Sequence, residues 1–256
     1  MKAVLKYPGA KWRISEWIIS HFPEHKVYCE PFFGSGAVFF NKSPAYIETI
    51  NDIDGNIVNL FKVCRDNPEE LARLIEFTPF AREEFENCYD KSDDPIEQAR
   101  RTLVRYHQSF GTSNSSKKSW RNVQTYGGPR TATMWNYLPG RISEICARLK
   151  EAQIENIDAI ELIRHYNDEN TLLYCDPPYL QSLRKKNIYS CELSEEYHIN
   201  LLSVLKESKS KIVLSGYDSQ LYNSMLSGWN TDEKQTTAQM GKHRVEKIWF
   251  NFEEVQ

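Results

Sequence analysis

The stretch 171–179, Thr-Leu-Leu-Tyr-Cys-Asp-Pro-Pro-Tyr, constrains the fold of this chain more than any other segment. Its first five residues form a short, mostly apolar run, which is typical of a strand buried on both faces in a parallel sheet. The two prolines end the strand, because neither donates a ladder hydrogen bond and each fixes its own φ. Asp176 precedes a proline and is therefore restricted to an extended conformation. The sequence predicts a stiff turn at the carboxyl end of a strand, where open α/β sheets bind ligands.

This turn presents three groups that suit a flat heterocycle with an exocyclic amino group. The Asp176 carboxylate and the Pro177 carbonyl can each accept one N–H of such an amine, which localises the nitrogen lone pair and makes it a better nucleophile. The Tyr179 ring can stack on the heterocycle. The alternative is a surface turn whose aspartate caps a helix, since Asp and Pro are common turn residues.

A glycine-containing turn, Pro-Phe-Phe-Gly-Ser-Gly at 31–36, follows the first expected strand at 27–30. Its two glycines permit a tight bend and leave the backbone bare against a ligand. It is neither a phosphate loop nor the dinucleotide fingerprint, because the lysine and the third glycine of those motifs are missing. Asp52 follows the next expected strand, at 45–50, in the position where nucleoside-binding α/β folds hold ribose hydroxyls.

Tyr7 and Lys11 flank a Pro-Gly turn near the N-terminus. An aromatic face and an ammonium at this place can hold a zwitterionic amino-acid ligand, with Lys11 facing its carboxylate. The residues alone favour the plainer interpretation, a terminal loop with a solvated lysine. Asp54 precedes a helical apolar period at 57–64, so we expect it to cap that helix.

The 256 residues suffice for one large domain, or for a core domain with a smaller one inserted. An apolar content of 40% and a charged content of 26% are typical of soluble globular proteins. No apolar run approaches the roughly 18 residues of a membrane span, and no signal-peptide block is present. The six cysteines and six histidines are scattered, so we expect a reducing, cytoplasmic setting without disulfides and without a metal.

The net charge of −3 conceals a strong asymmetry along the chain. Residues 100–150 carry ten basic side chains and one acidic, a net charge of +9, so the remainder carries −12. Such a block favours a polyanionic partner, although a solvated charged face is the alternative. Residues 111–137 mix polar, basic and aromatic types without an apolar period, which predicts a loop or hairpin. Lys117, Lys118, Arg121 and Arg130 suit phosphates and guanine edges, whereas Trp120, Tyr126 and Asn136 either contact bases or pack.

Four segments, Tyr7–Lys11, Glu30–Gly36, Asn51–Asp54 and Asp176–Tyr179, together resemble the Dam-type (D12 class) adenine-N6 DNA methyltransferases. The resemblance extends over almost the whole chain. It implies an α/β fold, with a Rossmann-like, S-adenosylmethionine-binding core built on a mostly parallel seven-stranded sheet. It also implies an inserted helical and hairpin target-recognition domain, and the basic block falls in that insertion. We therefore expect a catalytic domain over 1–66 and 151–256 and a recognition domain over 67–150.

The resemblance also implies site residues. The residues expected to contact the cofactor are Tyr7, Lys11, Phe32, Gly34, Gly36, Asp52 and Asp176, and the catalytic residues are Asp176, Pro177, Pro178 and Tyr179. Tyr7 stands where many relatives carry tryptophan, and stacking survives that change. The recognition insertion matches only loosely, so the target sequence stays open. The residues expected to bind DNA are Lys117, Lys118, Arg121, Arg130 and Asn136.

The implied reaction is direct methyl transfer from S-adenosylmethionine to N6 of an adenine flipped out of double-stranded DNA, with neither a metal nor a covalent enzyme intermediate. We expect a cytoplasmic, DNA-associated enzyme of a bacterium or phage with no obligate protein partner. The nearest alternative is N4-cytosine methylation, because the cytosine amine meets the same acceptors. Methylation of RNA or of a protein amide, or a catalytically silent nucleic-acid-binding module of the same fold, are further alternatives. The residues do not determine the target sequence, a cognate endonuclease or the oligomeric state.

Overall fold

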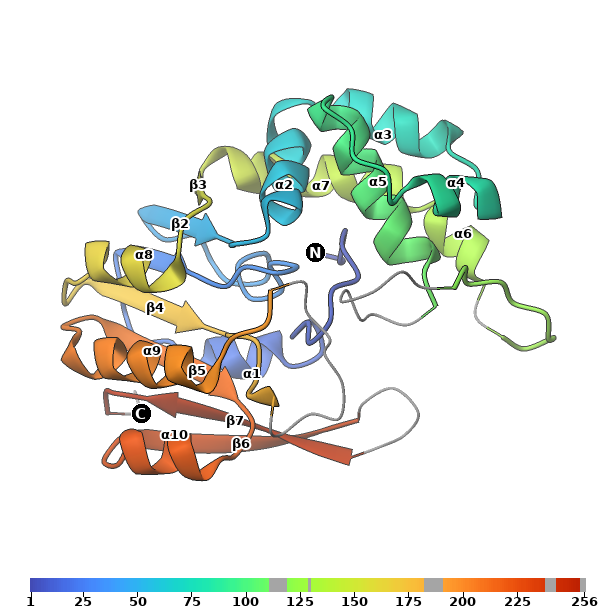
Figure 1. Ribbon diagram of the computed structural model, residues 1–256. Coiled ribbons are helices and arrows are strands. Elements are labelled where there is room, and N and C mark those ends of the chain that lie inside the picture. The colour runs from blue at the N-terminus through green and yellow to red at the C-terminus, as the bar shows by residue number, and fades with distance from the viewer. Residues whose placement is uncertain (111–118, 129, 182–190, 238–242, 254–256) are drawn as a thin grey trace.

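The structure, a computed structural model, describes residues 1–110, 119–128, 130–181, 191–237 and 243–253 (Figure 1). Its strands form one sheet in the order β3-β2-β1-β4-β5-β7-β6. They are β1 (Val27–Glu30), β2 (Ile47–Asn51), β3 (Gln153–Glu155), β4 (Thr171–Cys175), β5 (Lys211–Gly216), β6 (Asn230–Thr237) and β7 (His243–Phe250). The pairs from β3 to β5 are parallel, whereas β7 is antiparallel to both β5 and β6. The predicted fold class, α/β with a mostly parallel seven-stranded sheet, is confirmed.

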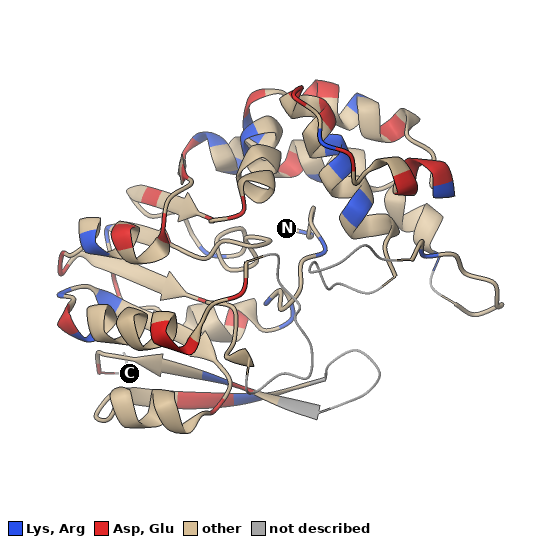
Figure 2. Cartoon of the chain, viewed as in Figure 1, with Lys and Arg blue, Asp and Glu red and all other residues tan. Residues whose placement is uncertain are grey.

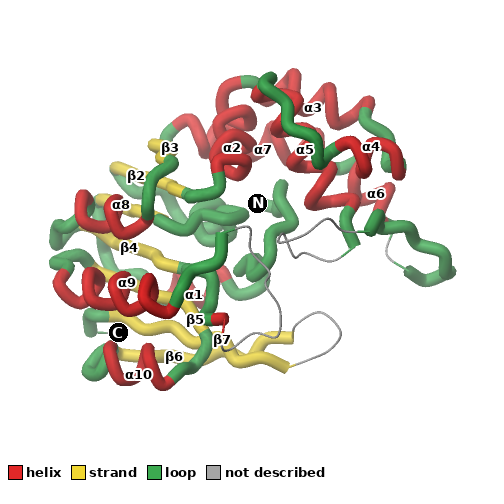
Figure 3. Tube along the Cα trace, in the orientation of Figure 1, coloured by secondary structure: helices red, strands yellow, loops and turns green. Residues whose placement is uncertain are grey.

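Some helices cover the two faces of the sheet (Figure 3). The others gather in a group on the side of β2 and β3. The helices are α1 (Ser15–Ser20), α2 (Gly55–Asp66), α3 (Pro68–Phe77), α4 (Arg82–Asn87), α5 (Pro95–Gln108), α6 (Thr131–Trp135), α7 (Leu138–Lys150), α8 (Ala159–His165), α9 (Glu195–Glu207) and α10 (Gln220–Met225). Asp54 caps α2 as predicted, accepting a hydrogen bond from the Asn56 amide. Helix α1 begins only at Ser15, because φ of Ile14 is −125° and the chain before Ser15 forms turns.

Strand β4 lies at the centre of the sheet and is completely buried, as its sequence predicts. Leu172 and Tyr174 belong to the hydrophobic cluster on one face, which includes Ile18 of α1 and Phe61 of α2. The intervening Leu173 belongs to the cluster on the other face, under α8, α9 and α10. Burial on both faces places the end of β4, and therefore Asp176, at a fixed point of the molecule.

The inserted segment packs against the sheet rather than standing apart from it. Leu103 of α5 and Ile142 of α7 belong to the same buried cluster as Tyr28 of β1. A buried ion pair joins Arg148 of α7 to Glu48 of β2, reinforced by a hydrogen bond of 2.7 Å. A continuous core thus joins the insertion to the sheet. The division into a catalytic domain and a recognition domain stays a prediction.

Candidate active site

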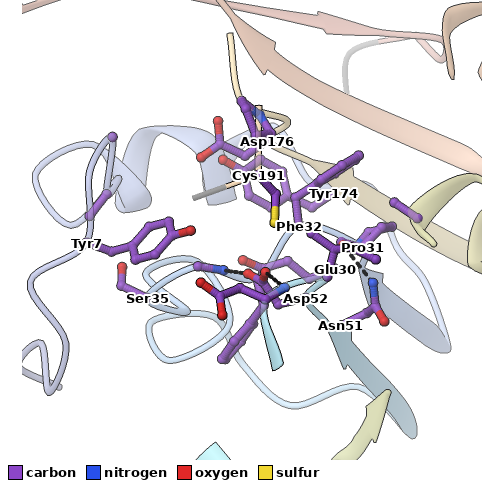
Figure 4. Close-up of a pocket in the computed structure, with 18 of the residues that line it drawn as sticks. Tyr7, Glu30, Pro31, Phe32, Ser35, Asn51, Asp52, Tyr174, Asp176 and Cys191 are labelled. Atoms are coloured by element: carbon purple, nitrogen blue, oxygen red, sulfur yellow. Dashed lines mark hydrogen bonds between the residues drawn. The ribbon is translucent and has the colours of Figure 1, made fainter. Parts of the chain in front are cut away.

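A pocket of about 280 Å³ lies where the carboxyl ends of β1, β2 and β4 meet. Figure 4 shows Asp176 above this pocket and Asp52 below it, with Tyr7 at its left edge. Its walls come from the N-terminal turn 7–11, residues 30–35, 37–38 and 51–54, and Asp158, Ala159, Tyr174, Asp176, Pro178, Cys191, Leu193 and Tyr197. The structure therefore brings together residues from all four segments that carried the resemblance.

Gly34 gives the pocket a bare stretch of backbone. Its φ of +52° lies in the left-handed region, and its amide donates a 2.8 Å hydrogen bond to Oδ2 of Asp52. A Cβ at this position would lie 3.0 Å from Cδ1 of Tyr7. Glycine is therefore needed both for the bend and for the close approach of the Tyr7 ring.

Gly36 has a different environment from Gly34, although both were expected around the cofactor. Its φ is +66°, and a Cβ there would lie 2.4 Å from Cζ of Phe33 and 2.6 Å from Cε2 of Phe40. Gly36 is absent from the described walls of the pocket, whereas Phe32 and Gly34 are part of them. The side of Gly36 where a side chain would stand faces the aromatic core.

Asp52 is held rigidly at the end of β2. Its Oδ2 accepts the Gly34 amide, and its Oδ1 accepts the amide of Asp54 at 2.9 Å. Burial raises the pKa of Asp52 to about 6, and these backbone hydrogen bonds oppose the rise. Because a carboxylate has lone pairs for about four hydrogen bonds, the same oxygens can still accept ligand hydroxyls.

Asp176 forms an ion pair with Lys11 at the edge of the pocket. The Oδ1–Nζ distance is 2.7 Å, and the side chains of Asp176 and Lys11 are 19% and 5% exposed. Burial raises the pKa of Asp176 to about 6, although the Lys11 ammonium opposes the rise. The interpretation of Lys11 as a solvated loop lysine is therefore wrong, since its ammonium contacts a carboxylate inside the site.

The other residues of the diproline motif lie at different depths. Pro178 lines the pocket, whereas Pro177 and Tyr179 are buried. The Tyr179 hydroxyl accepts a 2.5 Å hydrogen bond from Lys11, and its ring centroid lies 4.3 Å from that of Tyr217. Stacking of Tyr179 on a substrate base stays a prediction.

Sequence reasoning missed several acidic residues at or near this site. Glu30 lines the pocket, and its burial raises its pKa to about 8. Asp158 also lines the pocket, caps α8 and accepts a 2.8 Å hydrogen bond from the Tyr197 hydroxyl. Glu246 of β7 is buried and accepts a hydrogen bond from the Tyr179 hydroxyl. Glu246 lies two residues before the buried Ile248, so both side chains point to the same face of β7. An acidic residue on this apolar face is the sequence signal that could have identified it.

The residues expected to bind DNA lie in or beside the insertion. An isolated antiparallel bridge joins Ser109 to Trp120, and the Arg121 amide donates to the Gln108 carbonyl at 2.7 Å. The loop or hairpin expected here stays a prediction, because residues 111–118 lie outside the described residues. Arg130 and Asn136 are exposed at the two ends of α6. Lys117 and Lys118 lie outside the described residues. The two aromatic residues that were expected either to contact bases or to pack differ in their exposure to solvent. Trp120 packs against Phe80, whereas Tyr126 is fully exposed.

Part of the basic block is neutralised in space. Arg100 pairs with Glu84 and Glu97, and Arg101 also pairs with Glu97. Acidic and basic residues accordingly intermingle along the helices of the insertion (Figure 2). Counting charges along the chain therefore overstated the positive charge that this region presents.

The described part of the chain shows neither a metal-binding cluster nor a membrane-spanning helix. No group of three or more His, Cys, Asp and Glu side chains is arranged there to hold a metal ion. No helix there combines the length and the apolar character needed to cross a membrane.

Several known proteins are similar in sequence to this chain over most of its length. The DNA adenine methylase of Haemophilus influenzae is 25% identical over 241 residues, covering 88% of this chain and 82% of its own length. The Escherichia coli K12 DNA adenine methylase is 26% identical, covering 86% and 82%. A type II methyltransferase of Lactococcus lactis is 25% identical, covering 94% and 90%. Among solved structures, a putative methyltransferase from Escherichia coli has a TM-score of 0.40 at 10% identity, covering 96% of this chain and 90% of its own; the fold assignment rests on the sheet order.

A family profile matches nearly the entire chain. It is described as "D12 class N6 adenine-specific DNA methyltransferase", and the match covers residues 7–240. It therefore spans the N-terminal turn, the glycine turn, the insertion and the diproline motif. The chain belongs to the family of D12 class N6 adenine-specific DNA methyltransferases.

Proposed function

We propose that this adenine-specific DNA methyltransferase modifies an adenine flipped out of double-stranded DNA, with Asp176 as the principal acceptor for its N6 amine. One observation carries the proposal: Asp176 directly follows β4, and it lines the same pocket as Asp52 and the bare backbone of Gly34. An acceptor for an amine thus lies beside a site suited to a nucleoside.

The pocket residues fit S-adenosylmethionine, which supplies a methyl group bound to a positively charged sulfur. Asp52 lies where it can accept the ribose hydroxyls, while Tyr7 and Phe32 offer apolar faces. Gly34 admits a ligand close to the backbone because no side chain fills that space. The volume of about 280 Å³ is near the lower end of ordinary small-molecule sites.

Asp176 and the two prolines prepare the amine for attack. The ionised carboxylate accepts one N–H, and the Pro177 carbonyl accepts the second, so the nitrogen lone pair is localised and aimed. The prolines keep these acceptors oriented before the base arrives. After attack, the excess proton leaves the nitrogen towards Asp176.

We expect a specific pH dependence from Asp176. Its pKa of about 6 lies above its ordinary value, so the carboxylate loses its charge as the pH falls through about 6. The single-turnover rate should be constant above this pH and fall about tenfold for each unit below it. Saturating S-adenosylmethionine separates this effect from titration of Asp52, which would weaken cofactor binding instead. A rate that stays constant down to about pH 5 would contradict this role.

The DNA contacts follow from exposed basic residues on the insertion. We expect Arg130→Ala to weaken binding of any duplex and to lower the slope of log affinity against log salt by about 1. Fluorescence anisotropy between about 50 and 200 mM salt measures both quantities. Arg65→Ala is the matched control, because Arg65 is a surface arginine paired with Asp66 on α2. An unchanged slope for Arg130→Ala would remove this residue from the interface. With DNA as substrate, we place the enzyme in the cytoplasm with the chromosome.

Transfer of a labelled methyl group to plasmid DNA tests the proposed function. Nucleoside analysis should recover N6-methyladenine, and mapping should locate it at defined sites. Recovery of N4-methylcytosine would instead support the alternative substrate. A chain that binds DNA but takes up no S-adenosylmethionine by calorimetry would be the catalytically silent module.

A further inference from the structure

Three segments far apart in sequence meet behind the diproline turn. Lys11 comes from the N-terminal turn, Tyr179 from the turn after β4, and Glu246 from β7. The Lys11 ammonium lies 3.3 Å from Oε1 of Glu246, and the Tyr179 hydroxyl donates to the same oxygen. Glu246 is 5% exposed and does not belong to the described pocket walls.

Lys11 is thereby shared between two carboxylates. Its ammonium lies 2.7 Å from Oδ1 of Asp176 and 3.3 Å from Oε1 of Glu246. Among the residues that the structure describes, the titratable groups that interact with Asp176 include Lys11, Glu30, Tyr174, Cys175, Tyr179, Tyr222 and Glu246. Lys11 is the cation of this set. Burial, Lys11 and then Glu246 have the largest effects on the pKa of Asp176, and Glu246 opposes Lys11.

This arrangement has a chemical consequence for the acceptor. A lysine paired with Asp176 alone would draw electron density from its carboxylate and weaken it as a hydrogen-bond acceptor. A second carboxylate on the same ammonium divides that attraction. The hydrogen bond from Tyr179 to Glu246 also fixes the last residue of the motif that carries Asp176.

We propose that Glu246 is a positioning residue for methyl transfer, holding Lys11 and Tyr179 so that Asp176 keeps the orientation and acceptor strength that the adenine amine requires. The inference rests on the proposed function. It assigns Glu246 no contact with substrate or cofactor, and it gives the C-terminal antiparallel strand β7 a part in the reaction.

The substitution Glu246→Gln keeps the shape of the side chain and removes its charge. We expect single-turnover methyl transfer to fall about ten- to a hundredfold, because misplacement of a catalytic group has effects of this size. Affinity for S-adenosylmethionine, measured by calorimetry, should change less than about twofold, since Glu246 lies outside the pocket walls. The acid limb of the pH–rate profile should move to lower pH, because Lys11 would then stabilise the Asp176 charge unopposed.

Two further variants complete the test. Glu233→Gln is the matched control, since Glu233 is an exposed glutamate of β6 that pairs with Lys247, and it should leave the rate and the pH profile unchanged. Glu246→Asp keeps the charge with a shorter side chain, so we expect a lower rate with the acid limb in place. If Glu246→Gln does not fold, Glu246→Asp decides, and a wild-type rate for it would overturn the inference.

The outcomes separate this inference from the proposed function. A wild-type rate and pH profile for Glu246→Gln, in an enzyme that methylates adenine, would overturn the inference alone. A lower rate with an unmoved acid limb would also overturn it, because a purely structural defect lowers the rate equally at every pH. Absence of adenine methylation by the wild-type chain would instead contradict the proposed function.

Discussion

Asp176→Ala should lower single-turnover methyl transfer about a hundredfold to a thousandfold, which is the usual effect of removing one preorganised hydrogen-bonding group from an active site. The variant loses the acceptor for the adenine amine and the 2.7 Å partner of Lys11. Lys11 keeps Glu246 as a second carboxylate partner at 3.3 Å, so its buried charge stays compensated and the chain should fold. Single-turnover assays with labelled S-adenosylmethionine measure the rate, and circular dichroism verifies the fold.

Two companion variants sharpen this experiment. Asp176→Asn preserves the shape but replaces one acceptor oxygen with a donor, so it should be nearly as inactive as the alanine variant. Asp218→Ala removes an exposed aspartate just beyond β5, whose partner is Lys247, and should keep the wild-type rate. Near-normal turnover by either Asp176 variant would discard Asp176 as the acceptor.

Local sequence rules were sufficient wherever the decisive physics is local. The diproline block defines the end of β4 and its apolar run predicts a strand buried on both faces, whereas the mostly parallel seven-stranded sheet was expected from the family resemblance. Asp54 was identified as a cap because capping depends on the few residues that follow. The class of the sheet and the place of Asp176 could therefore be predicted.

Contacts between distant segments could not be predicted in the same way. Lys11 and Asp176 are 165 positions apart, and the sequence around Lys11 alone suggested a solvated side chain. Arg100 also pairs with Glu84 of α4, so part of the positive charge counted for residues 100–150 is cancelled once α4 and α5 pack together. Such pairings depend on tertiary structure, which no local pattern encodes.

The two glycines of the turn at 31–36 present the same difficulty, because both appeared to be residues that leave space for a ligand. Both have positive φ, so any side chain is strained at either position. A side chain at 34 would meet the Tyr7 ring at the pocket, whereas one at 36 would meet Phe33 and Phe40 in the core. The sequence motif thus combines one residue for the ligand with one for packing.

Gly36→Ala should therefore destabilise the fold strongly. The left-handed backbone costs about 1–2 kcal/mol for alanine, and overpacking against two core rings adds about 1–3, so we expect a loss of roughly 2–5 kcal/mol in the free energy of unfolding. Urea titration followed by circular dichroism measures this loss. Gly228→Ala is the matched control, because Gly228 has a φ of +91° and no atom within 4 Å of its Cβ position, so it isolates the backbone effect.

Gly34→Ala should separate cofactor binding from stability. Its Cβ would lie 3.0 Å from the Tyr7 ring, which is displaced more easily than Phe33 in the core. We therefore expect a stability loss close to that of Gly228→Ala, together with weaker binding of S-adenosylmethionine in calorimetry. Equal stability of the Gly36 and Gly228 variants would show that the aromatic core yields to an added methyl group, and the packing role of Gly36 would then be wrong. The opposite ranking, in which Gly36→Ala loses cofactor affinity and Gly34→Ala loses stability, would reverse the roles of the two glycines.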